Sequence, residues 1–215
     1  MYVPEAFKED RLAVLHDAIR RHSFATLVTS VGDEPEASHV PMFLESEVGP
    51  FGTLFGHLAR ANPHWRQAQA GGRALAIFLG PHAYVSPTWY ETKRTTGEVV
   101  PTWNYLAVHA RGTITFYDDP AELRAHVRKL TDMHEAARAE RWTVDEAPEA
   151  YIDRMLRGII GFRLAIATLE GKWKMSQNRS EQDVDGVRQA LVGDGAETDK
   201  AVAAIMAERK ARPRR

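Results

Sequence analysis

The sequence predicts an α+β protein whose antiparallel sheet closes, or nearly closes, into a barrel flanked by helices. Segments rich in β-branched and aromatic residues follow one another through short turns, which is typical of antiparallel pairing. About six or seven such segments occur, and some are apolar on both sides, which favours a barrel. Helical patterns lie at the start of the chain and on either side of the last strand.

The first quarter of the chain alternates helix, strand and turn. Leu12, Leu15 and Ile19 recur at helical spacing and predict a helix over Glu5 to Arg21. The β-branched run Phe24 to Ser30 predicts a strand, followed by a turn at VGDEP. The next strand, Glu36 to Leu44, contains Pro41, and a proline favours an edge strand or a bulge over a central strand.

A stretch from Thr53 to Trp65 predicts a strand that turns at Gly56 and leads into a short helix. Asn62 before Pro63 has the pattern of a helix cap with proline at the first helical position. The helix is expected over 63–70, and it should end at Gly71 and Gly72. The order then continues with two strands, Ala74 to Leu79 with both faces covered and His82 to Tyr90 with a break at Pro87.

The second half begins with a polar loop from Glu91 to Val100 and a strand from Ala107 to Tyr117 that bends at Gly112. Asp119-Pro120 predicts the start of a helix whose apolar face holds Leu123, Val127, Leu130 and Ala137. The remaining expected elements are a helix over 148–156, a strand over 159–169, a helix capped at Ser180, and a last helix over 199–210.

Composition limits the possible functions. The 215 residues have a formal net charge of −1 and no cysteine, so disulfides, thiolate catalysis and cysteine zinc sites are excluded. No phosphate-loop, dinucleotide, nucleophile-elbow or HExxH motif occurs, and no metal site is expected. The charged N-terminus does not suit a signal peptide, and no apolar run is long enough to span a membrane, so we expect a cytoplasmic protein.

Two groups of residues are candidates for binding an anion. His57, Arg60 and Asn62 come just before the predicted short helix, whose N-terminus favours negative charge. Lys172, Lys174 and Arg179 surround Trp173 close to Ser176, Gln177 and Asn178, and such donors suit phosphate or carbonyl oxygens. The alternative for both groups is ordinary solvated surface.

Tryptophans accompany polar donors near several expected loops and strand ends. Trp89–Tyr90 and Trp103–Tyr105 form two aromatic clusters on either side of the predicted polar loop. Such residues can hold a flat aromatic ligand, and they can equally pack in a core or an interface. Spacing alone does not decide between these interpretations.

Several stretches, in order, resemble one family: MYVPEAF, ASHVPMFL, FGHLARANPHW, AYVSPTWY, VPTWNY and GKWKMSQNR. They are similar to the PaiB-type FMN-binding negative transcriptional regulators, a branch of the FMN-binding split-barrel superfamily. The resemblance runs from Met1 to about Leu191. It implies a six-stranded antiparallel FMN-binding split β-barrel, a homodimer, and FMN in clefts at the dimer interface. We therefore expect a flavin domain over 1–193 and an appended helix and basic tail over 194–215.

The same resemblance assigns FMN-binding roles to individual positions. Arg60 would pair with the phosphate, and its stretch, with His57, Leu58 and Asn62, would frame the ribityl–phosphate end. The strand containing Ser38, His39 and Val40 would lie along the isoalloxazine edge. A second segment would close the pocket, from the same or the other subunit, through Trp103, Lys174, Ser176 and Gln177.

The expected function is that of an FMN-binding homodimer of the PaiB-type regulator class. Contact with DNA follows from the resemblance only, because the net charge is near zero and no helix-turn-helix is evident. One alternative is a flavin-dependent oxidoreductase, with His39, His57 and Tyr105 near the ring but no assigned catalytic residue. Another is a flavin-storage or structural dimer.

Overall fold

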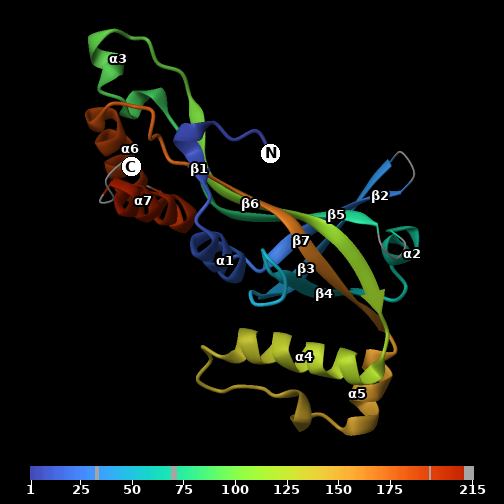
Figure 1. Cartoon of the computed structure of the whole chain (residues 1–215). Helices are drawn as coiled ribbons and strands as arrows, with labels where there is room; N and C mark the ends of the chain where they lie inside the picture. The colour runs from blue at the N-terminus through green and yellow to red at the C-terminus, as the bar shows by residue number, and fades with distance from the viewer. Residues whose placement is uncertain (32–33, 69–71, 194, 211–215) are drawn as a thin grey trace. The chain divides into compact units, whose positions relative to one another are not determined.

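A computed structural model describes residues 1–31, 34–68, 72–193 and 195–210. Its strands form one antiparallel sheet in the order β1-β7-β4-β3-β2-β5-β6, and further pairing of β7 with β6 closes six of them into a ring (Figure 1). The predicted α+β class and six-stranded barrel are therefore confirmed. The strands are β1 Lys8–Glu9, β2 Phe24–Val31, β3 Glu34–Glu45, β4 Thr53–Ala59, β5 Arg73–Val85, β6 Thr102–Tyr117 and β7 Ile159–Lys174.

Helices precede, interrupt and follow the sheet along the chain. The α-helices are α1 Leu12–Arg21, α2 His64–Ala68, α3 Thr92–Thr95, α4 Pro120–Glu135, α5 Glu149–Leu156, α6 Glu181–Gly193 and α7 Glu197–Lys210. Short 3-10 turns occupy Glu5–Phe7, Pro87–Trp89 and Val144–Glu146. None of the described helices is both long and apolar enough to cross a membrane.

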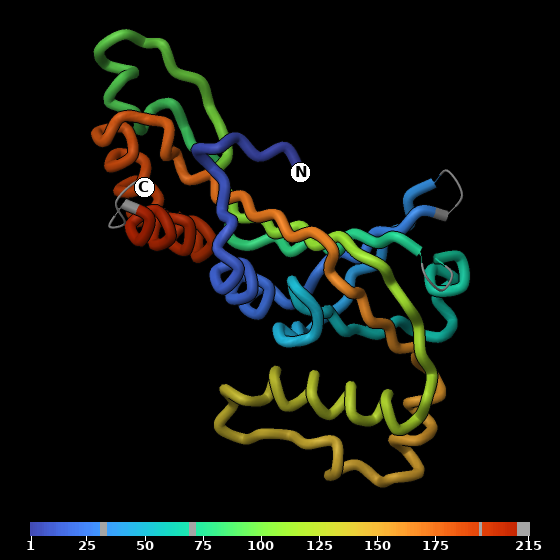
Figure 2. The backbone as a smooth tube through the Cα atoms, viewed as in Figure 1, coloured from blue at the N-terminus to red at the C-terminus, as the bar shows by residue number. Residues whose placement is uncertain are grey.

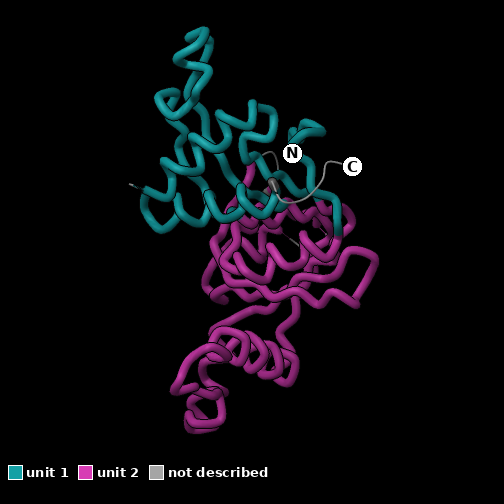
Figure 3. Tube along the Cα trace, turned by 90° about the vertical axis from the view of Figure 1, so that its left-hand side faces the viewer, with its two compact units in different colours: residues 1–11, 79–108, 170–215 teal, residues 12–78, 109–169 magenta. Residues whose placement is uncertain are grey.

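The described chain divides into two compact units (Figure 3). Unit 1 comprises residues 1–11, 79–108 and 170–215, and unit 2 comprises residues 12–78 and 109–169. Three of the boundaries fall inside β5, β6 and β7, and the fourth lies between β1 and α1; the chain can be followed through each of them in Figure 2. Each unit is described below by itself.

In unit 2, β3 changes its pairing partner at Pro41. Its first part pairs with β2 as far as Phe24↔Pro41, and its last part pairs with β4 from Met42↔Gly56 onward. Proline has no N–H to donate, so it suits the residue at which one ladder stops. The expectation of an edge strand is wrong, because β3 lies between β2 and β4 in the sheet.

The turn predicted at Gly56 is wrong, because Gly56 lies within strand β4. Strand β4 runs on to Ala59 and pairs along this length with β7, with Gly56 opposite Phe162. A Cβ at position 56 would lie 2.4 Å from the Phe162 ring, which is closer than real contacts allow. The glycine therefore makes room for an aromatic core residue on the neighbouring strand.

Strand β5 is continuous, although two strands were expected. Every second residue is buried along Ala74, Ala76 and Phe78. Between Gly80 and Ala83 the alternation shifts by one residue, so the buried positions change from even to odd numbers. The other face is not covered as predicted, since Leu79 is exposed and its neighbours Leu75 and Ile77 are only half-buried. Gly80-Pro81 thus marks a change of face within a strand rather than its end.

Long-range contacts override two other local expectations, both in unit 1. Lys8 and Glu9 form β1 with Lys172 and Gly171 of β7, so the predicted first helix begins only at Leu12. The predicted loop after Glu91 contains α3. There the Asp183 carboxylate of α6 accepts hydrogen bonds from the Thr92 backbone N–H at 2.9 Å and from its hydroxyl at 2.7 Å.

The predicted start of α4 is confirmed. The Asp119 carboxylate accepts hydrogen bonds from the backbone N–H groups of Ala121 and Glu122, as a helix cap does. Helix α4 packs with α5 around a small apolar cluster of Leu123, Val144, Ile152 and Leu156. Ala137, expected on the same helical face, follows the end of α4 at Glu135.

The remaining expectations concern termini and turns. Strand β7 continues to Lys174, five residues beyond its predicted end at Leu169. Helix α7 begins at Glu197 and buries Val202, Ala203 and Met206 within unit 1. The expected turn residues 32 and 33, the helix end at Gly71 and the basic tail 211–215 lie outside the described residues.

Candidate functional site

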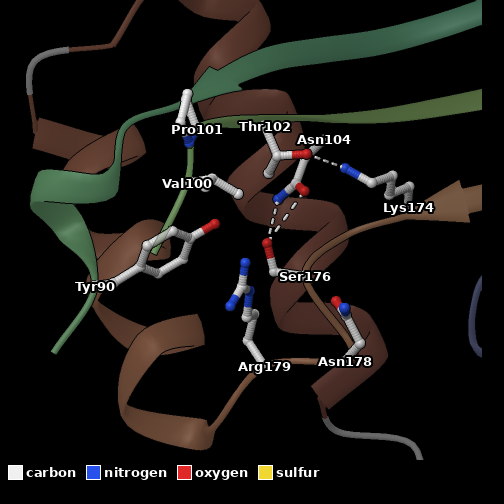
Figure 4. A pocket seen from close by; sticks show the side chains of 9 residues that line it. All are labelled: Tyr90, Val100, Pro101, Thr102, Asn104, Lys174, Ser176, Asn178 and Arg179. Carbon is white, nitrogen blue, oxygen red and sulfur yellow. Dashed lines mark hydrogen bonds between the residues drawn. The ribbon is translucent and has the colours of Figure 1, made fainter. Parts of the chain in front are cut away.

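A polar pocket of about 100 Å³ in unit 1 combines two cationic side chains with hydroxyl and amide groups. We call it the Lys174–Arg179 pocket. Figure 4 shows the Arg179 guanidinium and the Ser176 hydroxyl directed into the space between Tyr90 and Asn104. Its lining residues are Tyr90, Val100, Pro101, Thr102, Asn104, Lys174, Ser176, Asn178 and Arg179.

The pocket forms where β7 ends beside the start of β6. Ser176 follows the strand and has a left-handed backbone, with φ of 63°, which is uncommon for a residue other than glycine. Its side chain is held by Asn104 on β6: the Asn104 amide donates to Ser176 Oγ at 3.0 Å, and Ser176 Oγ donates back to Asn104 Oδ1 at 3.1 Å. Both residues are buried, so this exchange fixes the polar wall of the pocket.

The electrostatics of the pocket favour an anion. None of its lining residues is acidic. Burial and the charges of Lys172 and Arg179 lower the pKa of Lys174, which means that these surroundings disfavour its charged ammonium form. A negative charge nearby would favour that form. Lys174 Nζ donates to the Thr102 hydroxyl and to the Trp103 carbonyl, and the Arg179 guanidinium lies 5.0 Å from the Tyr90 ring centroid.

Size and donors together define what the pocket can hold. A volume of about 100 Å³ suits a phosphate or carboxylate and excludes a three-ring flavin. Arg179 and Lys174 can make charge-assisted hydrogen bonds to oxygens of such a group. An anion placed there would offset the mutual repulsion of the two cations.

A second polar cluster, in unit 2, surrounds the fully buried His64 at the start of α2. His64 Nδ1 lies 2.8 Å from Ser38 Oγ and its Nε2 lies 2.8 Å from Thr29 Oγ1. Asn62 donates to Ser38 Oγ at 3.1 Å and accepts from the His64 backbone N–H at 2.9 Å, which confirms the predicted cap. This cluster joins Ser38 and Asn62, two of the predicted site residues, through a histidine that the sequence did not single out.

Arg60 and His57, also in unit 2, point to other partners. Arg60 Nε donates to the Arg157 carbonyl at 3.0 Å, and its guanidinium lies 3.4 Å from the Asp118 carboxylate. His57 Nδ1 lies 3.0 Å from Nε2 of His126 on α4, and burial lowers the pKa of His57. A phosphate would have to compete with the Asp118 carboxylate for the Arg60 guanidinium, so the role assigned to Arg60 stays a prediction.

The other predicted residues differ in exposure and environment. His39 is exposed and contacts the Thr26 hydroxyl at 3.0 Å, whereas Val40 and Leu58 are buried in the core. In unit 1, Trp103 is 52% exposed. Gln177 accepts a hydrogen bond from the Met175 backbone N–H and donates to the Trp173 carbonyl, so it closes the turn after β7.

Of the nine residues that line the pocket, only Lys174 and Ser176 were predicted as site residues. The main polar and aromatic residues that the prediction missed are Arg179, Asn104 and Tyr90. Arg179, Asn104 and Tyr90 belong to the cationic and aromatic clusters noted in the sequence, but their convergence depends on pairing across 72 positions, as between Asn104 and Ser176. His64 gave a weaker signal, because its only local mark is its place next to the Asn62-Pro63 cap.

The ring of six antiparallel strands with flanking helices defines a split barrel. Residues 1–168 match the family model described as "Putative FMN-binding domain", and the chain belongs to this family. It is 31% identical over 209 residues to "Protease synthase and sporulation protein PAI 2" of Bacillus subtilis, covering 97% of this chain and 98% of that protein.

Solved structures share the fold. The FAD and heme binding protein from Mycobacterium smegmatis superposes with a TM-score of 0.57 at 17% identity, covering 83% of this chain and 78% of that one. The flavocytochrome Anf3 from Azotobacter vinelandii gives a TM-score of 0.57 at 12% identity, covering 86% and 78% of the two chains. At such low identity the likeness concerns the fold alone.

Proposed function

We propose that this protein binds FMN as a homodimer and acts in the PaiB-type class of negative transcriptional regulators. The observation that carries the proposal is the match of residues 1–168 to an FMN-binding family on a sheet that closes as a split barrel. The likeness to PAI 2 over nearly the whole of both chains supports the PaiB type. The regulatory role is taken from the resemblance of the sequence motifs.

The Lys174–Arg179 pocket fits the phosphate end of FMN. Lys174 and Arg179 would supply positive charge, and Ser176 and Asn104 would supply hydroxyl and amide groups to the phosphate oxygens. Arg60 forms an ion pair with Asp118 at 3.4 Å. Arg179 also has a carboxylate in its electrostatic environment, that of Asp183, but Asp183 does not line the pocket, so this pocket is the better supported phosphate site. The flavin would provide its own redox chemistry, while these residues bind and orient it.

A second copy of the chain would complete the flavin site. The rings of Tyr84 and Trp103 in unit 1 are both exposed, with centroids 6.0 Å apart, and the centroid of the His82 ring lies 6.1 Å from that of Trp103. Exposed aromatic clusters of this kind mark interaction surfaces. We infer that this cluster contacts the partner subunit or the flavin ring.

Titration of the flavin-free protein with FMN and with riboflavin, which lacks the phosphate, tests the proposal. Because charge-assisted bonds to the phosphate are worth about 1.5–3 kcal/mol, FMN should bind about ten- to a hundredfold more tightly. A protein that rejects FMN, or binds both flavins equally, contradicts the assigned site. Reduction of the bound flavin by NADH or NADPH, followed by turnover with an acceptor, would favour the alternative of a flavin-dependent oxidoreductase.

DNA binding is tested separately by a gel shift with the full chain and with a chain ended after Lys210. This end point preserves α7, whose apolar face is buried. Loss of specific binding in the shorter chain would assign the contact to the basic tail. Absence of specific binding by the full, flavin-loaded chain would refute the regulatory part of the proposal.

A further inference from the structure

Unit 2 contains a second cavity, of about 220 Å³, next to helix α4 and strands β3 and β4. We call it the His126 cavity. Four of its eight lining residues have aromatic rings, and the remainder are one alanine and three charged residues. They are Phe43, Glu45, Phe55, Tyr117, Glu122, Ala125, His126 and Lys129.

The rings are arranged as a connected wall. Phe43 and Phe55 stack with centroids 5.2 Å apart and planes 7° apart. The ring of His126 lies 5.2 Å from that of Phe43 and 6.4 Å from that of Tyr117. Offset and edge contacts of this kind are also those by which an added aromatic ring would be held.

The charges around the cavity are compensated. Lys129 is paired with Glu45, and Glu122 accepts from Arg163 at 2.5 Å. Burial and the neighbouring His57 lower the pKa of His126 to about 4, so its imidazole is neutral at pH 7. A charged ligand would therefore have to disrupt an existing ion pair or lose its hydration without a free partner.

Tyr117 offers a polar group to a ligand. It lines the cavity, and its hydroxyl makes no hydrogen bond to any group in the described part of the chain. Nδ1 of His126 also has no hydrogen-bond partner there, but it is buried. Burial raises the pKa of Tyr117 to about 12, so the hydroxyl keeps its proton at neutral pH. An apolar cavity of about 150 Å³ is known to bind benzene, and the His126 cavity has room for a substituted ring.

We propose that the His126 cavity is a binding site for a small neutral aromatic compound with one hydrogen-bonding substituent, of the phenol class. The ring would pack on Phe43, Phe55 and His126, and the substituent would meet the Tyr117 hydroxyl. The site is independent of the proposed flavin site, since none of its lining residues belongs to the Lys174–Arg179 pocket.

Fluorine NMR of 4-fluorophenol with the full, flavin-loaded protein tests the proposal. Ala125 lines the cavity from an exposed position of α4, so Ala125→Phe fills the cavity without removing a core residue. We expect it to weaken binding at least about tenfold. Ala121→Phe, at another exposed position of the same helix that does not line the cavity, should leave binding within about twofold. Far-ultraviolet circular dichroism and flavin absorbance check that both variants fold.

Tyr117→Phe keeps the ring and should weaken 4-fluorophenol about three- to tenfold, as expected for one hydrogen bond. This variant decides the matter if Ala125→Phe does not fold. The charged analogues 4-fluorobenzoate and 4-fluorobenzylamine should bind at least about tenfold more weakly than the phenol. The proposal would be overturned if the protein did not bind 4-fluorophenol, or if Ala125→Phe bound it as tightly as the unsubstituted protein does. Binding of the charged analogues as tight as that of the phenol would also overturn it.

Discussion

Asn104 and Ser176 exchange two hydrogen bonds, of 3.0 and 3.1 Å, across the buried wall of the Lys174–Arg179 pocket. The two residues stand on β6 and just after β7, 72 positions apart in the sequence. Their pairing holds the left-handed turn that places Lys174, Ser176 and Arg179 around one small space.

Substitution of Asn104 tests this arrangement. Asn104→Ala leaves the buried Ser176 hydroxyl without its partner, and an unsatisfied buried group costs about 1–3 kcal/mol. We expect a fall of that size in the free energy of unfolding, together with weaker FMN binding. In a double-mutant cycle with Ser176→Ala the two changes should be non-additive, and simple additivity would show that the pair is not coupled.

Trp103→Glu should weaken the proposed homodimer. The exposed indole would be replaced by a carboxylate that must lose its hydration at an interface, and sedimentation at micromolar concentrations should show more monomer. Val192→Glu, at an exposed apolar position of α6 in the same unit, is the matched control. An unchanged dimer in Trp103→Glu would place the interface elsewhere.

The buried His126 should make stability depend on pH. Its folded pKa of about 4 lies below the usual 6.5, so between these values the unfolded chain binds more protons. Stability is therefore expected to fall as pH drops from 6.5 toward 4, by about 3 kcal/mol in total for a shift of this size. His126→Gln should reduce the slope of the free energy of unfolding over this window, to which the lowered pKa values of His57, His64 and His22 also contribute, whereas His134→Gln, exposed on the same helix, should keep the slope.

Gly112 should tolerate no side chain. A Cβ there would lie 1.9 Å from the Ala165 carbonyl oxygen, a backbone atom that cannot turn away. Gly112→Ala is expected to lower the free energy of unfolding by at least about 1–3 kcal/mol, the usual cost of overpacking. Gly193→Ala, with nothing within 4 Å of its Cβ, should change it little. Equal denaturation midpoints for these two variants would refute this account of the close approach at Gly112.

Local signals in the sequence were sufficient where the structure depends on neighbouring residues. The Asp119 and Asn62 caps and the runs of strands were all readable because each involves contacts within a few positions. Predictions from local sequence failed where a residue distant in the sequence determines the structure. Lys8 and Glu9 form a strand because β7 pairs with them, and Gly56 stays in β4 because Phe162 needs the space.

The residues of the candidate site likewise divide into those recognisable from a short segment of sequence and those that only the fold brings together. Lys174, Ser176 and Arg179 stood out as a cationic and polar group in one short segment. Tyr90 and Asn104 join them only through the pairing of strands distant in sequence. Arg60 looked like a phosphate ligand beside a helix start, but the identity of its partner Asp118 depends on how α5 and the end of β6 approach it.

The most direct test of the central claim is the FMN dissociation constant of Arg179→Ala measured against that of Arg94→Ala. Both substitutions remove one arginine from unit 1, and Arg94 is exposed and paired with Glu91 away from the pocket. If the Lys174–Arg179 pocket holds the flavin phosphate, Arg179→Ala should weaken FMN binding about ten- to a hundredfold and leave riboflavin binding unaffected. Its effect on FMN binding should be larger than that of Arg60→Ala. Unchanged FMN affinity in Arg179→Ala, with Arg60→Ala strongly impaired, would contradict it.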